Sequence, residues 1–194
     1  MNVGIFIYDE AEVLDFSGPF EVFSTASRVE GRAVFTPFLV AQSERAVVAR
    51  AGYRVLPHCY FGDCPSLDIL MVVGGAHDGQ MHNQTVLDWI AHTSKTVKQI
   101  SSVCTGAFLL AQAGVIGAQT VTTHHADRED LQRQFPSLTV QKNKKWVEDG
   151  AVITSGGISA GIDMSLHLVG KWHSLELAQK TAGLMEYDWV GSSI

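Results

Sequence analysis

The sequence predicts a doubly wound α/β fold, with a mostly parallel sheet between two layers of helices. Two observations predict it. Short apolar runs with strand character alternate with segments of helical periodicity, as in successive βαβ units. Several of these runs are continuously apolar, which is typical of strands that are buried on both faces. The chain has 194 residues and shows no linker or repeat, so we expect one domain over residues 1–194.

The first βα unit is expected at the start of the chain. Val3–Tyr8 is continuously apolar and predicts the first strand. A helix is expected to follow and to run to about Arg28, with Ser17 or Asp15 as its cap and Pro19 in its first turn. The chain would thereby return over one face of the sheet.

The remaining elements follow from the same patterns. We expect further strands at Thr36–Ala41, Asp68–Val73, the first half of Thr96–Gly114, Gln119–Thr123, Thr139–Asn143 and Ala151–Ser155, with a small β-excursion over 46–57. Residues 144–148 are expected to connect the last two strands. Helices are expected at Gln84–Thr93, the second half of Thr96–Gly114, Ala126–Gln134, Ser159–Trp172 and Leu175–Glu186.

Composition excludes several classes of protein. A net charge of −6 and a pI near 5.7 argue against a nucleic-acid-binding surface, which would be basic. The sequence contains no apolar run long enough to cross a membrane, and its N-terminus lacks the cationic region of a signal peptide. Its three cysteines are an odd number, which favours a reduced, cytoplasmic protein over a disulfide framework.

The segment Ser102-Val103-Cys104-Thr105-Gly106 has the spacing of a nucleophile elbow, with cysteine as the nucleophile. Such an elbow presents the side chain at the end of a strand and at the N-terminus of a helix. We expect the helix N-terminus to lower the pKa of the Cys104 thiol. The alternative is a small buried cysteine without a chemical role.

Further chemical groups are expected at the carboxyl edge of the sheet, where sites gather in open α/β folds. They lie at Asp15, Gly74-Gly75, His124-His125 and the loop from Gly156 to Ser159. A thiol, a carboxylate, imidazoles and backbone N–H donors together are typical of nucleophilic catalysis.

Each of these groups also has a purely structural interpretation. Asp15 could serve only as a helix cap, and Thr105 only as a helix residue. His125 could be an exposed loop residue. Gly74 and Gly75 could only permit a tight turn, or their N–H groups could form an oxyanion-type donor pair with the N–H that follows Cys104.

Metal and nucleic-acid binding have weak signals. Cys59 and Cys64 beside His58 are only a faint metal pattern, and the other histidines show no ligand spacing, so no metal is expected. The short basic run over 142–145 is expected to be a solvated turn.

Five segments together resemble the ThiJ/PfpI superfamily, whose fold is flavodoxin-like and related to class I glutamine amidotransferases. They are Val13–Phe23, Val73–Gly75, Ser102–Ala107, Thr122–His124 and Thr154–Asp163. The pattern resembles two branches, the isonitrile hydratases and the amidase-like domain of AraC-type regulators. The first resemblance implies a cofactor-free enzyme for a small-molecule substrate, acting as a homodimer, with Cys104, Asp15 and Thr105 as catalytic residues. Gly74, Gly75, His124, Ile158 and Ser159 would line its oxyanion site and pocket.

Two departures qualify this resemblance. Proteases and deglycases of the superfamily carry histidine after the nucleophilic cysteine, whereas Thr105 stands here, which argues against peptidase activity. The tail after Glu186-Tyr187 also differs from that of the hydratases. A glyoxalase or amidase, and a ligand or redox sensor built on Cys104, remain alternatives. In the hydratase interpretation, Asp15 would relay a proton and Thr105 would orient Asp15 or the attacking water.

Overall fold

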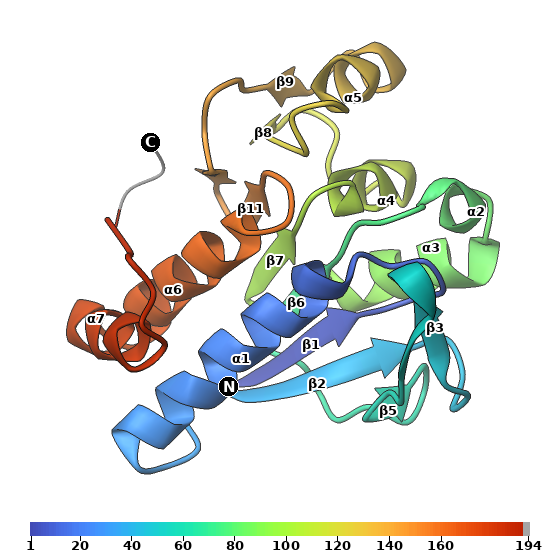
Figure 1. Ribbon diagram of the computed structural model, residues 1–194. Coiled ribbons are helices and arrows are strands. Elements are labelled where there is room, and N and C mark those ends of the chain that lie inside the picture. The colour runs from blue at the N-terminus through green and yellow to red at the C-terminus, as the bar shows by residue number, and fades with distance from the viewer. Residues whose placement is uncertain (192–194) are drawn as a thin grey trace.

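The computed structural model describes residues 1–191 and confirms the α/β fold with a mostly parallel sheet (Figure 1). The strands are β1 (Asn2–Phe6), β2 (Thr36–Ala41), β3 (Val47–Ala49), β4 (Tyr53–Val55), β5 (Cys59–Tyr60), β6 (Ile69–Val72), β7 (Gln99–Ser102), β8 (Thr120–Val121), β9 (Thr139–Val140), β10 (Trp146–Asp149) and β11 (Val152–Ser155). The helices are α1 (Val13–Glu30), α2 (Asp78–Met81), α3 (Gln84–Thr93), α4 (Gly106–Gln112), α5 (Arg128–Gln134), α6 (Ala160–Trp172) and α7 (Leu175–Leu184), with a 3₁₀ turn at Arg50–Gly52.

The central sheet has seven strands in the order β10-β11-β7-β6-β1-β2-β5. All neighbouring pairs are parallel except β10 and β11. Every residue of β6 and of β7 is buried, as expected for central strands that are covered on both faces. The carboxyl ends of β1, β6 and β7 therefore meet at one edge, where the chain turns to form the candidate site.

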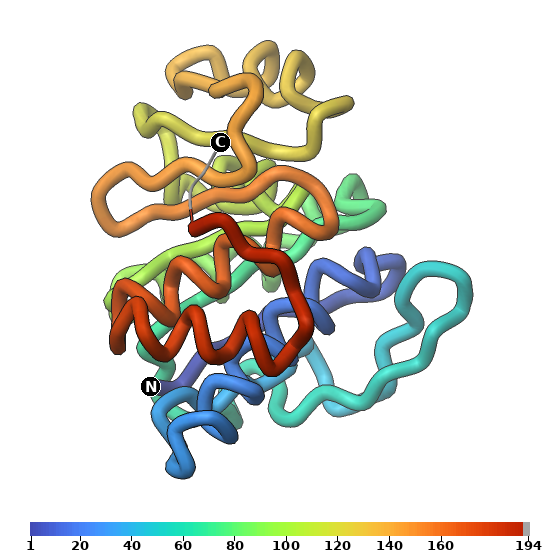
Figure 2. The backbone as a smooth tube through the Cα atoms, turned by 60° about the vertical axis from the view of Figure 1, so that its left-hand side comes forward, coloured from blue at the N-terminus to red at the C-terminus, as the bar shows by residue number. Residues whose placement is uncertain are grey.

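Two groups of helices cover the sheet. Helices α1, α6 and α7 pack against one another on one face, and α2, α3 and α4 pack together on the other (Figures 1 and 2). The short parallel pair β8–β9 and helix α5 form a small layer beside this framework, outside the main sheet (Figure 1). No helix within residues 1–191 has the length and apolar character to cross a membrane.

Helix α1 differs from the prediction in its start. It begins at Val13 after Glu12, so neither Ser17 nor Asp15 caps it, and Asp15 lies within its first turn. Pro19 lies in the helix interior rather than in its first turn, and the helix ends at Glu30, where Gly31 adopts the left-handed conformation (φ 73°). The earlier start matters because it rotates Asp15 into the protein interior.

The sequence interpretation missed the edge strand β10, which occupies part of the predicted connection over 144–148. Trp146–Asp149 pairs antiparallel with β11 through a turn at Gly150, whose φ is 63°. Its side chains are half-buried and partly charged, which suits an edge strand but hides the usual apolar signal. The β-excursion is confirmed as the hairpin of β3 and β4, whereas the short elements α2 and β5 were not predicted.

Candidate active site

Cys104 occupies a nucleophile elbow between β7 and α4. Its backbone is in the left-handed region (φ 55°), which is unusual for a residue other than glycine. The Cys104 N–H donates to the Gly156 carbonyl at 3.1 Å, and the Thr123 hydroxyl donates to the Cys104 carbonyl at 2.7 Å. At Gly106, a Cβ would lie 2.1 Å from the Val72 carbonyl oxygen. Only glycine lets the elbow approach the sheet this closely.

Asp15 enters the site from the first turn of α1 and is fully buried. Its Oδ2 accepts the Gly74 N–H at 3.0 Å, while Oδ1 has no hydrogen-bond partner among the described residues. Burial raises the pKa of Asp15 from 3.8 to about 7, and the N–H groups of Gly74 and Ile158 and the Cys104 thiol oppose this rise. Asp15 is therefore a buried carboxyl group that titrates near neutral pH, not a helix cap.

The predicted lowering of the Cys104 pKa is wrong. Burial, and after it the charge of Asp15, raises the pKa of the Cys104 thiol from 9.0 to about 12. The Thr105 N–H acts in the opposite direction but does not outweigh them. Cys104 is only 7% exposed, so loss of hydration dominates over the dipole of a seven-residue helix. At neutral pH the site therefore holds a thiol beside a half-ionised carboxyl group.

Gly74 and Gly75 approach the elbow closely, but their N–H groups are already used. The Gly74 N–H binds Asp15, and the Gly75 N–H donates to the Thr105 hydroxyl oxygen at 3.0 Å. They are therefore not a free oxyanion-type donor pair in this structure. The Thr105 hydroxyl in turn donates to the Gly75 carbonyl at 3.1 Å, so it does not orient Asp15 as predicted. Instead, Thr105 holds the Gly75 turn against the elbow.

A cleft of about 340 Å³ opens beside the thiol. It is lined by Glu12, Arg50, Gly75, Ala76, His77, Asp78, Cys104, Thr105, His124, Asp127 and Ile158. Of the predicted site residues, the structure therefore brings Gly75, Cys104, Thr105, His124 and Ile158 to the cleft. Asp15 and Gly74 are buried and do not line it, and Ser159 lines a neighbouring cleft instead. Because Asp15 is buried, it could contact only the part of a substrate that is bound to Cys104.

Four of the ionisable residues in this cleft occur as two pairs, and Asp78 has no ion-pair partner within residues 1–191. The His124 ring lies 3.0 Å from the Asp127 carboxylate, and Arg50 lies 3.6 Å from Glu12. The His77 ring packs on Phe108 with its centroid 4.6 Å away. The lining of this cleft therefore has three carboxyl groups, those of Glu12, Asp78 and Asp127, and one guanidinium group, that of Arg50.

The sequence interpretation missed Glu12, Arg50, His77, Asp78 and Asp127 as lining residues. Asp78 and His77 follow Gly74-Gly75 at the carboxyl edge of the sheet, a position that could have singled them out. Arg50 comes from the tip of the β3–β4 hairpin, and no local pattern places that tip over the elbow. The position of Arg50 at the cleft therefore depends on tertiary packing.

Cys59 and Cys64 form a disulfide, which corrects the prediction that the chain has none. The bond also removes these two sulfurs as metal ligands, and the neighbouring His58 uses Nδ1 to accept the Leu39 N–H at 3.1 Å. No group of three or more metal-binding side chains occurs within the described residues. Cys104 is the free cysteine of the chain.

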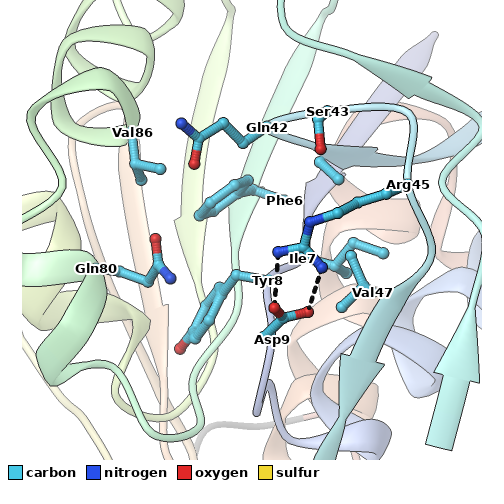
Figure 3. Close-up of a pocket in the computed structure, with 11 residues that line it drawn as sticks. Phe6, Ile7, Tyr8, Asp9, Gln42, Ser43, Arg45, Val47, Gln80 and Val86 are labelled. Carbon is cyan, nitrogen blue, oxygen red and sulfur yellow. Dashed lines mark hydrogen bonds and ion pairs between the residues drawn. The ribbon is translucent and has the colours of Figure 1, made fainter.

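A separate hollow of about 360 Å³, called here the Asp9 hollow, lies at the carboxyl ends of β1 and β2 (Figure 3). Asp9 and Arg45 form a two-pronged ion pair on its wall, with distances of 2.7 and 3.2 Å (Figure 3). Gln42, Gln80 and Tyr8 lie around it. No cysteine lines this hollow. Cys104, the free cysteine among the described residues, is therefore not part of it.

The chain is similar over nearly its whole length to characterised proteins of two kinds. An isonitrile hydratase of Pseudomonas putida is 31% identical over 189 residues, which cover 96% of this chain and 78% of that protein. The HTH-type transcriptional regulator GbdR of Pseudomonas aeruginosa is 22% identical, and the match covers 97% of this chain but about half (51%) of the regulator.

Solved structures and a family model agree on the relationship. A ThiJ/PfpI family protein from Pseudomonas syringae superposes with a TM-score of 0.85 at 28% identity, covering 96% of this chain and 75% of that one. Drosophila melanogaster DJ-1beta shares the fold, with a TM-score of 0.81 at 17% identity over 97% of this chain and 98% of that one. The model of the DJ-1/PfpI family matches residues 1–171. The chain therefore belongs to the DJ-1/PfpI family.

Proposed function

We propose that this protein is a cofactor-free hydratase of the isonitrile hydratase type, which converts R–N≡C and water to an N-substituted formamide. The observation that carries the proposal is the pairing of a dehydrated thiol with a buried carboxyl group whose pKa is about 7. Such a pair can move a proton at neutral pH without a metal. The similarity to the P. putida isonitrile hydratase supports the same reaction class.

The first half of the reaction forms a covalent intermediate. The sulfur of Cys104 attacks the terminal carbon of the isonitrile while Asp15, as the carboxylate, accepts the thiol proton. Attack leaves a carbanion-like carbon next to the new C–S bond. Asp15 returns the proton to that carbon and yields the thioimidate R–N=CH–S–Cys104. The raised pKa of Asp15 favours this return, because a carboxylic acid of ordinary pKa would hold too little proton at pH 7.

The second half regenerates the thiol. Water adds to the thioimidate carbon, one of its protons passes to the nitrogen, and the C–S bond breaks as the formamide carbonyl forms. The remaining water proton returns to the Cys104 sulfur through Asp15. Net consumption is one water per isonitrile. Thr105 and Gly75 act as positioning residues that hold the turn beside the elbow, and Ile158 supplies an apolar wall.

A sensor role is the alternative, motivated by the similarity to the GbdR regulator. Oxidation of a sensor cysteine depends on thiolate character and exposure. The high pKa and 7% exposure of Cys104 argue against ready oxidation of a resting thiol. In the enzyme, Asp15 removes the thiol proton only as the sulfur attacks, so a resting thiolate is not required.

We also propose a homodimer. Its interface would include the exposed apolar side chains Leu14, Val48 and Tyr53 near the N-terminus of α1, and sedimentation at micromolar concentration would test it.

The direct test is turnover. Purified protein is incubated with benzyl isonitrile, an α-oxoaldehyde and a small amide, and the products are followed by chromatography. We expect N-benzylformamide from the isonitrile, with kcat/KM rising with pH to a plateau above about pH 7 as Asp15 ionises. Cys104→Ala should abolish turnover, whereas the Cys59→Ser/Cys64→Ser double variant should retain it. Absence of any isonitrile turnover, together with stoichiometric oxidation of Cys104 by dilute peroxide, would overturn the hydratase in favour of the sensor.

A further inference from the structure

A second cleft of about 430 Å³ adjoins the cleft at the thiol. The two clefts share His124 and Ile158 as lining residues and are therefore neighbours. Each volume is within the range of small-molecule sites. Helix α5 supplies one wall of the second cleft, and the loop that opens α6 supplies another.

The second cleft carries cationic side chains that are not neutralised. Arg128 and Lys144 line it, and neither has a carboxylate within 4.0 Å among residues 1–191. Lys145 also lines it but is bound to the buried Asp163 at 3.1 Å. This concentration of unpaired positive groups is unexpected in a chain whose net charge is −6. It contrasts with the thiol cleft, where Arg50 and the His124 ring each lie beside a carboxylate.

The Arg128 guanidinium also has a donor that the protein leaves unsatisfied. Its Nε atom is buried and has no hydrogen-bond partner within the described part of the chain. Buried donors are nearly always paired, because the lost hydration is costly. An oxyanion is the group that matches a guanidinium best, since it accepts two parallel N–H donors.

The loop before α6 also favours an anionic ligand. Ser159 is exposed and lines the cleft at the N-terminus of this 13-residue helix, where the helix dipole favours negative charge. The Gly157 position is closed to larger residues, because a Cβ there would lie 2.1 Å from the His124 ring. His124 therefore packs tightly between the two clefts.

We propose that the second cleft is a subsite for an anionic group of the substrate, a carboxylate or a phosphate held mainly by Arg128 and Lys144. The inference rests on the proposed function and deepens it, since it assigns this hydratase an anionic isonitrile as substrate. The isonitrile carbon lies at Cys104 in the first cleft, where the carboxyl groups of Glu12, Asp78 and Asp127 disfavour an anionic group. The anionic end passes Ile158 and reaches Arg128.

The experiment compares benzyl isonitrile with its 4-carboxylate and 4-phosphate derivatives. We expect kcat/KM for the preferred anion to exceed that for the neutral compound by about 10- to 100-fold at low salt, the span of a charge-assisted hydrogen bond. Arg128→Gln should reduce that ratio by a similar factor, and Lys144→Gln, on an exposed loop, provides a second variant if the first misfolds. The matched control is Arg133→Gln, also on α5, which pairs with Asp130 at 2.6 Å and does not line the cleft. It should leave the ratio unchanged.

A binding measurement separates failure of the subsite from failure of the hydratase. Calorimetry with benzoate, phenyl phosphate and neutral benzamide needs no turnover. We expect an anion to bind more tightly than benzamide, and the difference to shrink in Arg128→Gln. If no isonitrile is turned over but this preference is found, the hydratase fails and the anion subsite stands. Equal turnover of neutral and anionic isonitriles, or equal binding of the three probes, would overturn the subsite.

Discussion

Two aspartates at the same edge of the sheet behave in opposite ways. Asp9 is partly exposed, and its bond to Arg45 is the main cause that holds the pKa of its carboxyl group below the usual value. Asp15 is fully buried without a cation beside it, and burial raises its pKa to about 7. Each lies next to a hollow of similar volume. The volume of a hollow therefore does not identify the reactive site in this protein. The reactive site is identified by a carboxyl group that has lost its hydration beside a nucleophile.

Tyr8 lies between these two regions. It lines the Asp9 hollow, is buried, and donates its hydroxyl to the Val73 carbonyl at 3.4 Å. Burial raises the pKa of Tyr8 well above its ordinary value, and the charges of Asp15 and Cys104 add to this effect. The influence of the Asp15 pair thus extends through the core to the wall of the other hollow, whereas the Asp9–Arg45 pair is largely screened by solvent.

The largest difference between Asp9 and Asp15 is expected when each carboxylate is replaced in turn by a neutral amide. Asp15→Asn removes the proton acceptor with little change in shape and should lower turnover by roughly 10²–10⁴-fold. Asp9→Asn should change turnover by no more than about twofold. The rates on benzyl isonitrile and the thermal midpoints of both variants are compared with the parent. Equal losses in the two variants, or an unchanged rate in Asp15→Asn, would contradict the relay.

The next largest effect concerns stability against pH. The folded pKa of Asp15 is above its unfolded value of 3.8, so its ionisation destabilises the fold progressively from about pH 4 to pH 7 and fully above that. The free energy of unfolding of Asp15→Asn relative to the parent should therefore increase over this window, by up to about 4 kcal/mol. Urea titrations at pH 4, 5.5, 7 and 8 measure it. A difference that does not vary with pH would show that Asp15 keeps an ordinary pKa.

Close packing at the elbow is tested with two glycines. A Cβ at Gly74 would lie 2.6 Å from the Thr105 nitrogen and 2.8 Å from the Cys104 Cβ, so Gly74→Ala should destabilise the protein by about 1–3 kcal/mol. It should also lower turnover, because the elbow must shift. Gly79→Ala in α2 is the control, since no atom lies within 4 Å of a Cβ there. If both variants denature at the same urea concentration as the parent, the elbow is not tightly packed.

The smallest effect is expected at the exposed ion pair. Arg45→Gln removes the partner of Asp9, and we expect a loss of at most about 1 kcal/mol because both side chains are substantially exposed. This loss should diminish at pH values low enough to protonate Asp9, whose depressed pKa stabilises the fold only above the acid range. Denaturant titration at low and high salt checks it. A larger, salt-independent loss would place this pair among the strong interactions of the fold.

Local sequence patterns were sufficient to predict the framework. The alternation of apolar strands and helices determined the α/β class, and Ser102-x-Cys104-x-Gly106 located the elbow, because strand and helix periodicity and tight turns depend on neighbouring residues. The edge strand β10 escaped detection because its exposed side lacks an apolar pattern.

The chemistry of the site was decided by tertiary structure. Sequence placed Cys104 at a helix N-terminus and thus suggested a lowered pKa, but the sign depends on how much water the folded chain removes from the thiol. Likewise, only the fold brings Arg50 from a distant hairpin to the cleft. Burial and contacts between distant segments arise from the packing of the whole chain, so no local pattern encodes them.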